Sequence, residues 1–158
     1  GYRDVMAHAA PVLDAICPRR HYLGAAGNGS RAKHAVNLIL GLNRAALAEG
    51  LVFAERLGLD RQAFLDVARG SAAQSQVMDV KGPLMARREF REPQSRIDQS
   101  LKDFRRMLEQ ARAAGEALPF ASVYVALLED CRRHGEGAWD NAAIADAILR
   151  RTSADSGG

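Results

Sequence analysis

The feature that most constrains the fold is one long stretch of helix-forming residues, 30–57. Ser30 is a residue type that caps helix starts, and Gly58 is typical of the position just beyond a helix end. A helix of about 28 residues is about 42 Å long, close to the diameter expected for a domain of this size. Apolar side chains fall on every side of it. This pattern predicts a buried helix through the centre of the fold, with a partner over any part that the domain leaves open.

Shorter helices are predicted on both sides of this stretch, from apolar residues at helical spacing and from capping residues. Gly82 and Pro83 are expected to disturb one of them. Only residues 19–23 suggest a short strand, so the predicted class is all-α. The expected helices cover 3–16, 60–69, 75–86, 95–114 with a capping-box-like start from Ser95 and Asp98, 119–134, and a last one capped by Asp140.

The composition is that of a soluble globular protein, with 47% hydrophobic and 26% charged residues. The net charge of +3 is too mild to predict nucleic-acid binding, and the basic run over 87–106 is interpreted as a solvated surface because acidic residues dilute it. Charged residues interrupt the most apolar stretch, so we expect no membrane span. Cys17 and Cys131 show no metal spacing and are interpreted as free thiols of a cytoplasmic protein.

The most informative motif is GNGSRAKHAVN, residues 27–37. Lys33 falls in the first turn of the long predicted helix. Asn37 lies one turn on, about 40° around and about 6 Å along, so both side chains point the same way. The helix dipole and partial burial both disfavour a charged ammonium at this position, which suits proton transfer. The alternative is a solvated lysine at a helix end and a satisfied core amide. Spacing alone leaves both interpretations open.

The same residues also satisfy a dinucleotide-binding pattern, G-x-G-x-x-A, with Gly27, Gly29 and Ala32. That fingerprint requires an acidic residue at the end of a second strand, about 20 residues further on. Glu49 has the right separation but lies inside the predicted long helix, so we reject the fingerprint. The histidines have no compact spacing that would predict a metal site.

The pattern Gly-x-Gly-x-x-x-Lys-x-x-x-Asn in residues 27–37 resembles, position for position, the catalytic signature of the β-hydroxyacid dehydrogenases. The best-known member of that family is 3-hydroxyisobutyrate dehydrogenase. Residues 45–59, 100–104 and 117–137 resemble later parts of the same family, so the likeness covers nearly the whole chain.

The resemblance implies the helical C-terminal domain of the 6-phosphogluconate dehydrogenase-like type, built around one long central helix. A complete family member begins with a dinucleotide-binding α/β domain, which we do not find here, so we expect the isolated chain to be inactive. The expected parts are a remnant helix and strand of the cofactor-binding Rossmann domain over 1–25, a helical substrate and dimerisation domain over 26–152, and a flexible tail over 153–158.

By this resemblance, Lys33 is the general acid/base of an NAD(P)-dependent dehydrogenase. It takes the hydroxyl proton of a small β-hydroxyacid as hydride passes to the nicotinamide, and it returns that proton when the semialdehyde is reduced. Asn37, Gly29 and Ser30 are expected to bind the substrate. Ser30 stands where 6-phosphogluconate dehydrogenases carry a histidine, which counts against a sugar phosphate as substrate.

Lys102 and Phe104, in the stretch SLKDF, are expected at the cofactor, which is NAD or NADP and is bound mainly by the domain that is missing. The alternative for Lys102 is a surface ion pair with Asp98, worth only a few tenths of a kcal/mol. The resemblance also implies a homodimer. The alternative for the whole chain is a non-catalytic helical module for dimerisation or interaction, in which Lys33 is incidental.

Overall fold

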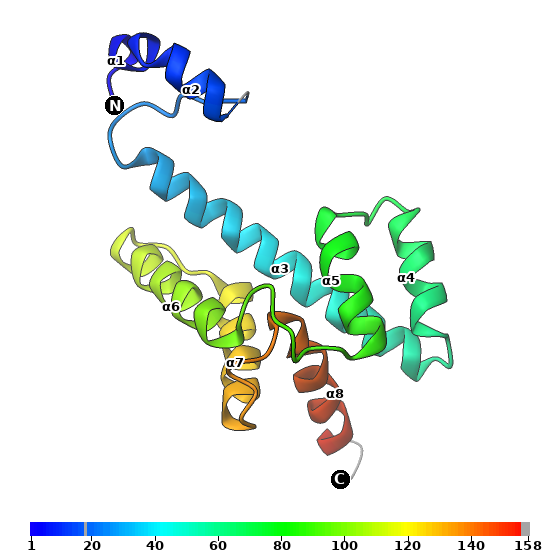
Figure 1. Cartoon of the computed structure of the whole chain (residues 1–158). Helices are drawn as coiled ribbons and strands as arrows, with labels where there is room; N and C mark the ends of the chain where they lie inside the picture. The colour runs from blue at the N-terminus through cyan, green and yellow to red at the C-terminus, as the bar shows by residue number, and fades with distance from the viewer. Residues whose placement is uncertain (18, 156–158) are drawn as a thin grey trace. The chain divides into compact units, whose positions relative to one another are not determined.

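The computed structural model describes residues 1–17 and 19–155, which form helices joined by loops (Figure 1). No strand occurs among these residues, so the all-α class is confirmed and the short strand expected at 19–23 is wrong. Residues 153–155 of the expected tail are helical, and 156–158 lie outside the described residues. The helices are α1 Arg3–His8, α2 Ala10–Ile16, α3 Asn28–Arg56, α4 Arg61–Arg69, α5 Gln76–Arg87, α6 Ile97–Ala113, α7 Pro119–Arg133, the 3-10 helix η1 Asn141–Ala143, and α8 Ile144–Asp155.

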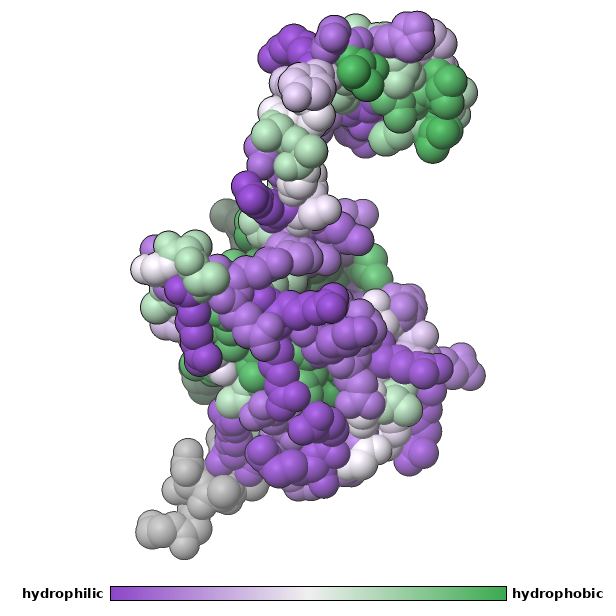
Figure 2. Space-filling model, turned by 90° about the vertical axis from the view of Figure 1, so that its left-hand side faces the viewer, coloured by the Kyte–Doolittle hydropathy of each residue, from purple (hydrophilic) through white to green (hydrophobic). Residues whose placement is uncertain are grey.

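Contacts within the chain divide it into two units, Gly1–Asn37 and Leu38–Gly158, and the boundary falls within α3. In the first unit, the single helix expected over 3–16 is split into α1 and α2. Pro11, in the first turn of α2, has no N–H and cannot continue the hydrogen bonding of α1. Figure 2 shows hydrophobic side chains on the surface of this unit. The large exposed ones are Tyr2, Val5, Val12, Ile16, Leu23 and Val36.

Helix α3 begins at Asn28, so the predicted N-cap Ser30 is wrong and lies inside the first turn. Gly27, just before the helix, has a φ of +89°, a left-handed value that glycine adopts without strain. The other end of the helix is as predicted. Gly58 has a φ of +83°, and its N–H donates to a carbonyl oxygen of the last helical turn at 2.9 Å.

Burial of α3 is uneven, so the prediction of a buried central helix is wrong for its first half. All of its buried residues lie between Gly41 and Ala54. Val36, Ile39 and Phe53 are 55%, 58% and 64% exposed. By length and composition alone, α3 could cross a membrane, but one such helix is weak support, because the core helix of a soluble protein passes the same test.

The second unit packs the rest of α3 with α4 to α8 around one hydrophobic core (Figure 1). Helix α4 packs against α5, and α7 packs against both α6 and α8. Every helix of this unit therefore contributes buried residues to the core. Its largest fully buried apolar side chains are Leu51, Leu65, Met85, Ile97, Leu101, Leu128 and Ile144.

Local signals set the boundaries of α4 and the path of α5. The capping prediction for α4 is confirmed, because the Asp60 carboxylate accepts a backbone N–H of the first turn at 2.8 Å. Helix α5 runs unbroken through Gly82 and Pro83, which corrects the prediction of a disturbed helix. A Cβ at Gly82 would lie 2.6 Å from Cδ1 of Leu65, so this glycine lets α5 approach α4 closely.

Helix α6 begins at Ile97, and no side chain caps it, so the predicted capping box with Ser95 is wrong. Its first two N–H groups donate instead to carbonyl oxygens of the loop before η1, both at 3.0 Å. Helix α7 starts at Pro119, as predicted. Asp140 caps η1, which leads into α8, by accepting the N–H of Ala142 at 2.9 Å.

Candidate functional site

Lys33 and Asn37 lie on helix α3 in the first unit. The helix is unbroken from Asn28 to Arg56, so the two residues stand one turn apart, as the sequence predicts. Lys33 is exposed and Asn37 is half-buried. The amine of Lys33 is therefore open to a ligand.

The surroundings of Lys33 differ from the prediction in two respects. Because α3 starts at Asn28, Lys33 lies in the second turn of the helix rather than the first, and the effect of the helix dipole falls off within the first turn. The exposed side chain also lacks the partial burial that we expected. The structure thus corrects both the position in the helix and the burial that the sequence predicted for Lys33.

Gly29 and Ser30 lie in the first turn of the same helix, and both are exposed. A Cβ at Gly29 would meet no atom within 4 Å, so packing in the described chain does not require glycine there. The structure places Gly29, Ser30, Lys33 and Asn37 on one helix of one unit. Their contact with a substrate stays a prediction.

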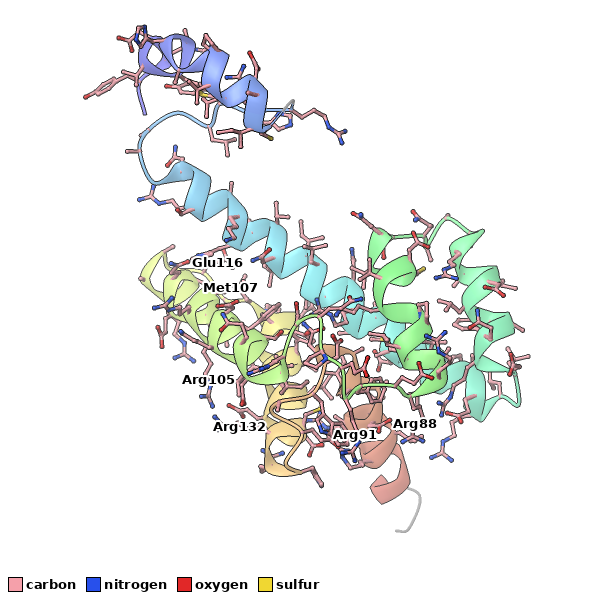
Figure 3. The ribbon with its side chains drawn as sticks, in the orientation of Figure 1. Arg88, Arg91, Arg105, Met107, Glu116 and Arg132 are labelled. Atoms are coloured by element: carbon pink, nitrogen blue, oxygen red, sulfur yellow. The ribbon has the colours of Figure 1, made fainter. Side chains whose placement is uncertain are left out.

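Lys102 lies on α6 in the second unit and is exposed. It lines an open groove of about 560 Å³, with basic residues of α6 and α7 around it. Figure 3 shows two of these, Arg105 and Arg132, on the same side of the unit. Arg105 pairs with Glu129 at 2.7 Å. The predicted role of Lys102 at a cofactor is compatible with its exposure and stays a prediction.

Phe104 is a core residue of the second unit and is 3% exposed. Its ring lies edge-on to Tyr124, with the ring centroids 4.5 Å apart, and it also packs on Gly41. This gives Phe104 a packing role. Its assignment to cofactor binding stays a prediction, which the buried ring does not support.

Two polar pairs of the second unit, one buried and one part-buried, were not predicted from the sequence. Lys81 Nζ donates to both carboxylate oxygens of Asp140 at 2.9 and 2.7 Å, and the two side chains are 7% and 0% exposed. Burial by itself raises the pKa of Asp140, but hydrogen bonds from Lys81 and from backbone N–H groups outweigh it and hold the pKa below its ordinary value. Arg44 donates to the Tyr124 hydroxyl at 2.6 Å, and burial raises the pKa of that hydroxyl.

The sequence carries only a faint sign of the first pair. Lys81 falls at helical spacing between the apolar residues Met78 and Met85, which places it on the buried face of α5. Its partner lies 59 residues away along the chain. A local pattern can therefore suggest that Lys81 is buried, but it cannot name Asp140.

Residues 27–148 match a family model described as the NAD-binding part of NADP-dependent 3-hydroxyisobutyrate dehydrogenase. The chain belongs to this family. The resemblance to the β-hydroxyacid dehydrogenases is thereby confirmed, and the cofactor of the family is NAD or NADP. The matched residues include the motif that carries Lys33 and Asn37.

Two curated relatives are similar over almost the whole chain. The chloroplastic glyoxylate/succinic semialdehyde reductase 2 of Arabidopsis thaliana is 28% identical over 157 residues, which is 99% of this chain and 43% of the relative. The 2-hydroxy-3-oxopropionate reductase of Escherichia coli is 28% identical over 148 residues, 94% of this chain and 50% of the relative. The chain thus spans about half the length of the curated relatives it matches.

The crystal structure of 3-hydroxyisobutyrate dehydrogenase from Salmonella typhimurium aligns with a TM-score of 0.84 at 26% sequence identity. The alignment covers 92% of this chain and 51% of that one. The fold prediction, an all-α C-terminal domain of this dehydrogenase family, is therefore confirmed. The division into parts over 1–25, 26–152 and 153–158 stays a prediction.

Proposed function

We propose that this chain is part of an NAD(P)-dependent oxidoreductase that interconverts a small β-hydroxyacid and its semialdehyde. The observation that carries the proposal is the family match over 27–148, which includes Lys33 and Asn37 one turn apart on an unbroken helix. The names of the relatives support the substrate class, because they describe reductases of glyoxylate, succinic semialdehyde and 2-hydroxy-3-oxopropionate.

Lys33 is the proposed general acid/base. Its neutral amine takes the proton from the substrate hydroxyl as the carbon loses hydride, and its ammonium returns the proton to the alkoxide in the reverse direction. Bound NAD(P) supplies the hydride acceptor or donor. Asn37 donates or accepts a hydrogen bond at the substrate, and the open surface beside Gly29 and Ser30 leaves room for it.

The exposure of Lys33 fits a site that this chain does not complete alone. The relatives are about twice as long as the chain, and we propose that their remaining half holds most of the cofactor and closes over the amine. Lys102 contributes a cationic contact to the cofactor from α6. The isolated chain is then expected to be inactive.

The test is Lys33→Ala in the full-length protein. Turnover is expected to fall by about 10²–10⁴, the usual scale of general acid/base catalysis. Arg112→Ala is the matched control, because it removes an exposed cation of α6 far along the chain from the motif and is expected to leave turnover unchanged. Near-full turnover of Lys33→Ala would show that the assigned role is wrong and would favour a non-catalytic interaction module.

We also propose a homodimer. Residues of α3, α7 and α8 surround an open, mainly apolar groove of about 690 Å³, beside which Phe120 and Val123 are 74% and 57% exposed. Glu49 and Arg151 also line it. A two-fold interface uses the same patch on both copies, so opposite charges within one patch can pair across it.

Sedimentation velocity tests the dimer. The chain is expected to sediment as a dimer and Val123→Asp as a monomer, because a charge would be buried at the interface. Val67→Asp is the control, since Val67 is 69% exposed on α4, away from the groove, and this variant should stay dimeric. A monomer for the unaltered chain would contradict the proposal. The cytoplasmic location and the absence of nucleic-acid and membrane partners stay predictions.

A further inference from the structure

The first turn of α6 is held by hydrogen bonds to another part of the chain. The N–H groups of Ile97 and Asp98 donate to the carbonyl oxygens of Trp139 and Gly137, each at 3.0 Å. These are donors that a helix cannot satisfy from within itself, and here no side chain of α6 satisfies them. The position of the first turn of α6 therefore depends on the loop that precedes η1.

Asp140 anchors that loop. Its carboxylate is fully buried and accepts the N–H groups of Gln94 and Ser95, at 2.8 and 3.3 Å, and that of Ala142 at 2.9 Å. Its backbone N–H donates to the carbonyl oxygen of Phe90 at 2.7 Å. One side chain thus joins the segment that leads into α6 to the start of η1.

Lys81 offsets the cost of burying the charged Asp140 carboxylate. A buried carboxylate without a counter-charge is strongly unfavourable, and Lys81 supplies the charge from α5 by hydrogen-bonding both oxygens. The carboxylate is also the acceptor for three backbone N–H groups, so loss of its charge would weaken all three contacts together. The pair therefore controls a set of backbone contacts rather than a single bridge.

We propose that Asp140 and Lys81 are positioning residues that hold the start of α6 and thereby place Lys102. Lys102 lies five residues after Ile97, about 7.5 Å along the helix, so a shift of the first turn moves its amine. The contact between Lys102 and the cofactor rests on the function proposed above. The proposal that the Asp140–Lys81 pair holds the start of α6 does not depend on that function.

The functional test uses the full-length protein and the double variant Lys81→Met/Asp140→Asn, which removes both charges and keeps the approximate volumes. Replacing both partners of a buried pair with neutral groups is commonly tolerated, whereas removing one leaves an unpaired charge. The KM for NAD(P) is expected to rise roughly tenfold, with a smaller change in kcat, and Lys102→Ala is expected to raise it similarly. Adding Lys102→Ala to the double variant should give no further increase, because the pair acts through Lys102.

The outcomes separate the two proposals. An unchanged KM in the double variant, or effects that multiply in the triple variant, overturns positioning through Lys102. An unchanged KM in Lys102→Ala overturns the cofactor contact of the proposed function, and with it the placement of Lys102 for that purpose. The single variant Lys81→Arg, with Asp140 intact, keeps the charge. Its KM for NAD(P) should therefore lie much closer to that of the unaltered protein than the KM of the double variant does.

Hydrogen exchange of the chain itself tests the hold on α6 without any assay of activity. In the double variant, the amides of Ile97 and Asp98 are expected to exchange at least about tenfold faster, while the amide of Phe64 in α4 keeps its rate. Equal acceleration at all three amides indicates general destabilisation and overturns local positioning. Unchanged rates at Ile97 and Asp98 overturn it as well.

Discussion

The close packing of α6 against α3 depends on the absence of a side chain at Gly41. A Cβ there would lie 2.2 Å from Cζ and 2.6 Å from Cε2 of Phe104. Carbon atoms in normal contact are about 3.5–4.0 Å apart, so Gly41→Ala requires a shift of at least about 1.3 Å. The ring of Phe104 cannot easily withdraw, because it is 3% exposed and packs edge-on against Tyr124.

Two effects set the change in the free energy of unfolding for Gly41→Ala. Overpacking a buried site costs about 1–3 kcal/mol, and so short a distance puts this site near the upper end. Alanine is more favourable than glycine inside a helix by about 1 kcal/mol. The expected net result is a loss of about 1–2 kcal/mol.

Gly50→Ala, on the same helix, is the matched control. A Cβ at Gly50 would lie 3.7 Å from Cε1 of Phe64, which is ordinary van der Waals contact. The helix preference for alanine then acts without a clash, and a gain of about 0.5–1 kcal/mol is expected. Because that preference is common to both variants, their difference of about 2–3 kcal/mol measures the steric cost at Gly41.

Urea unfolding followed by far-ultraviolet circular dichroism measures both variants. The dependence of the unfolding free energy on urea concentration should be the same in both variants and in the unaltered chain. Shifts in the unfolding midpoint then report stability alone. Phe104→Leu in the Gly41→Ala background should recover part of the loss, because the two sites share one contact. A Gly41→Ala protein as stable as Gly50→Ala would refute the packing argument.

Two further predictions concern the reactivity of the two cysteines and the loss of stability at low pH. Cys17 is exposed and Cys131 is buried, with a pKa that burial raises, so a thiol reagent should modify one cysteine in the native chain and both in urea; rapid native labelling of Cys131 would contradict this. The pKa of Asp140 is lowered in the folded state. Its stabilising contribution is thus complete above the unfolded value of about 4 and is lost as pH falls through its folded pKa. The free energy of unfolding should therefore fall less steeply with decreasing pH in the variant Lys81→Met/Asp140→Asn than in the unaltered protein. An equal slope in the two proteins would refute this prediction.

The sequence by itself determined the family and many helix boundaries. The motif over 27–37 is contiguous, so its resemblance needs no knowledge of packing. The Asp60 cap, the Pro119 start and the Gly58 end depend on one residue and its immediate backbone, and each is found where predicted. Such signals act within a few residues, which is why the sequence alone carries them.

The tertiary structure decided the start of α6, the burial of α3 and the burial of Phe104. Ser95 has the chemistry of a cap, but backbone carbonyl groups of a distant loop took that place. Apolar residues surround α3 on every side, yet packing buries only residues between Gly41 and Ala54. Phe104 stands in a motif that the resemblance assigns to a cofactor, and packing turned its ring into the core.

The partners of Lys81 and Tyr124 could come only from the packed helices. Asp140 lies 59 residues from Lys81, and Arg44 lies 80 residues from Tyr124. A buried charge requires a counter-charge or hydrogen-bond partner, but that requirement does not say where along the chain the partner stands. Capping and backbone conformation are properties of neighbouring residues, whereas burial and charge pairing exist only after distant helices have come together.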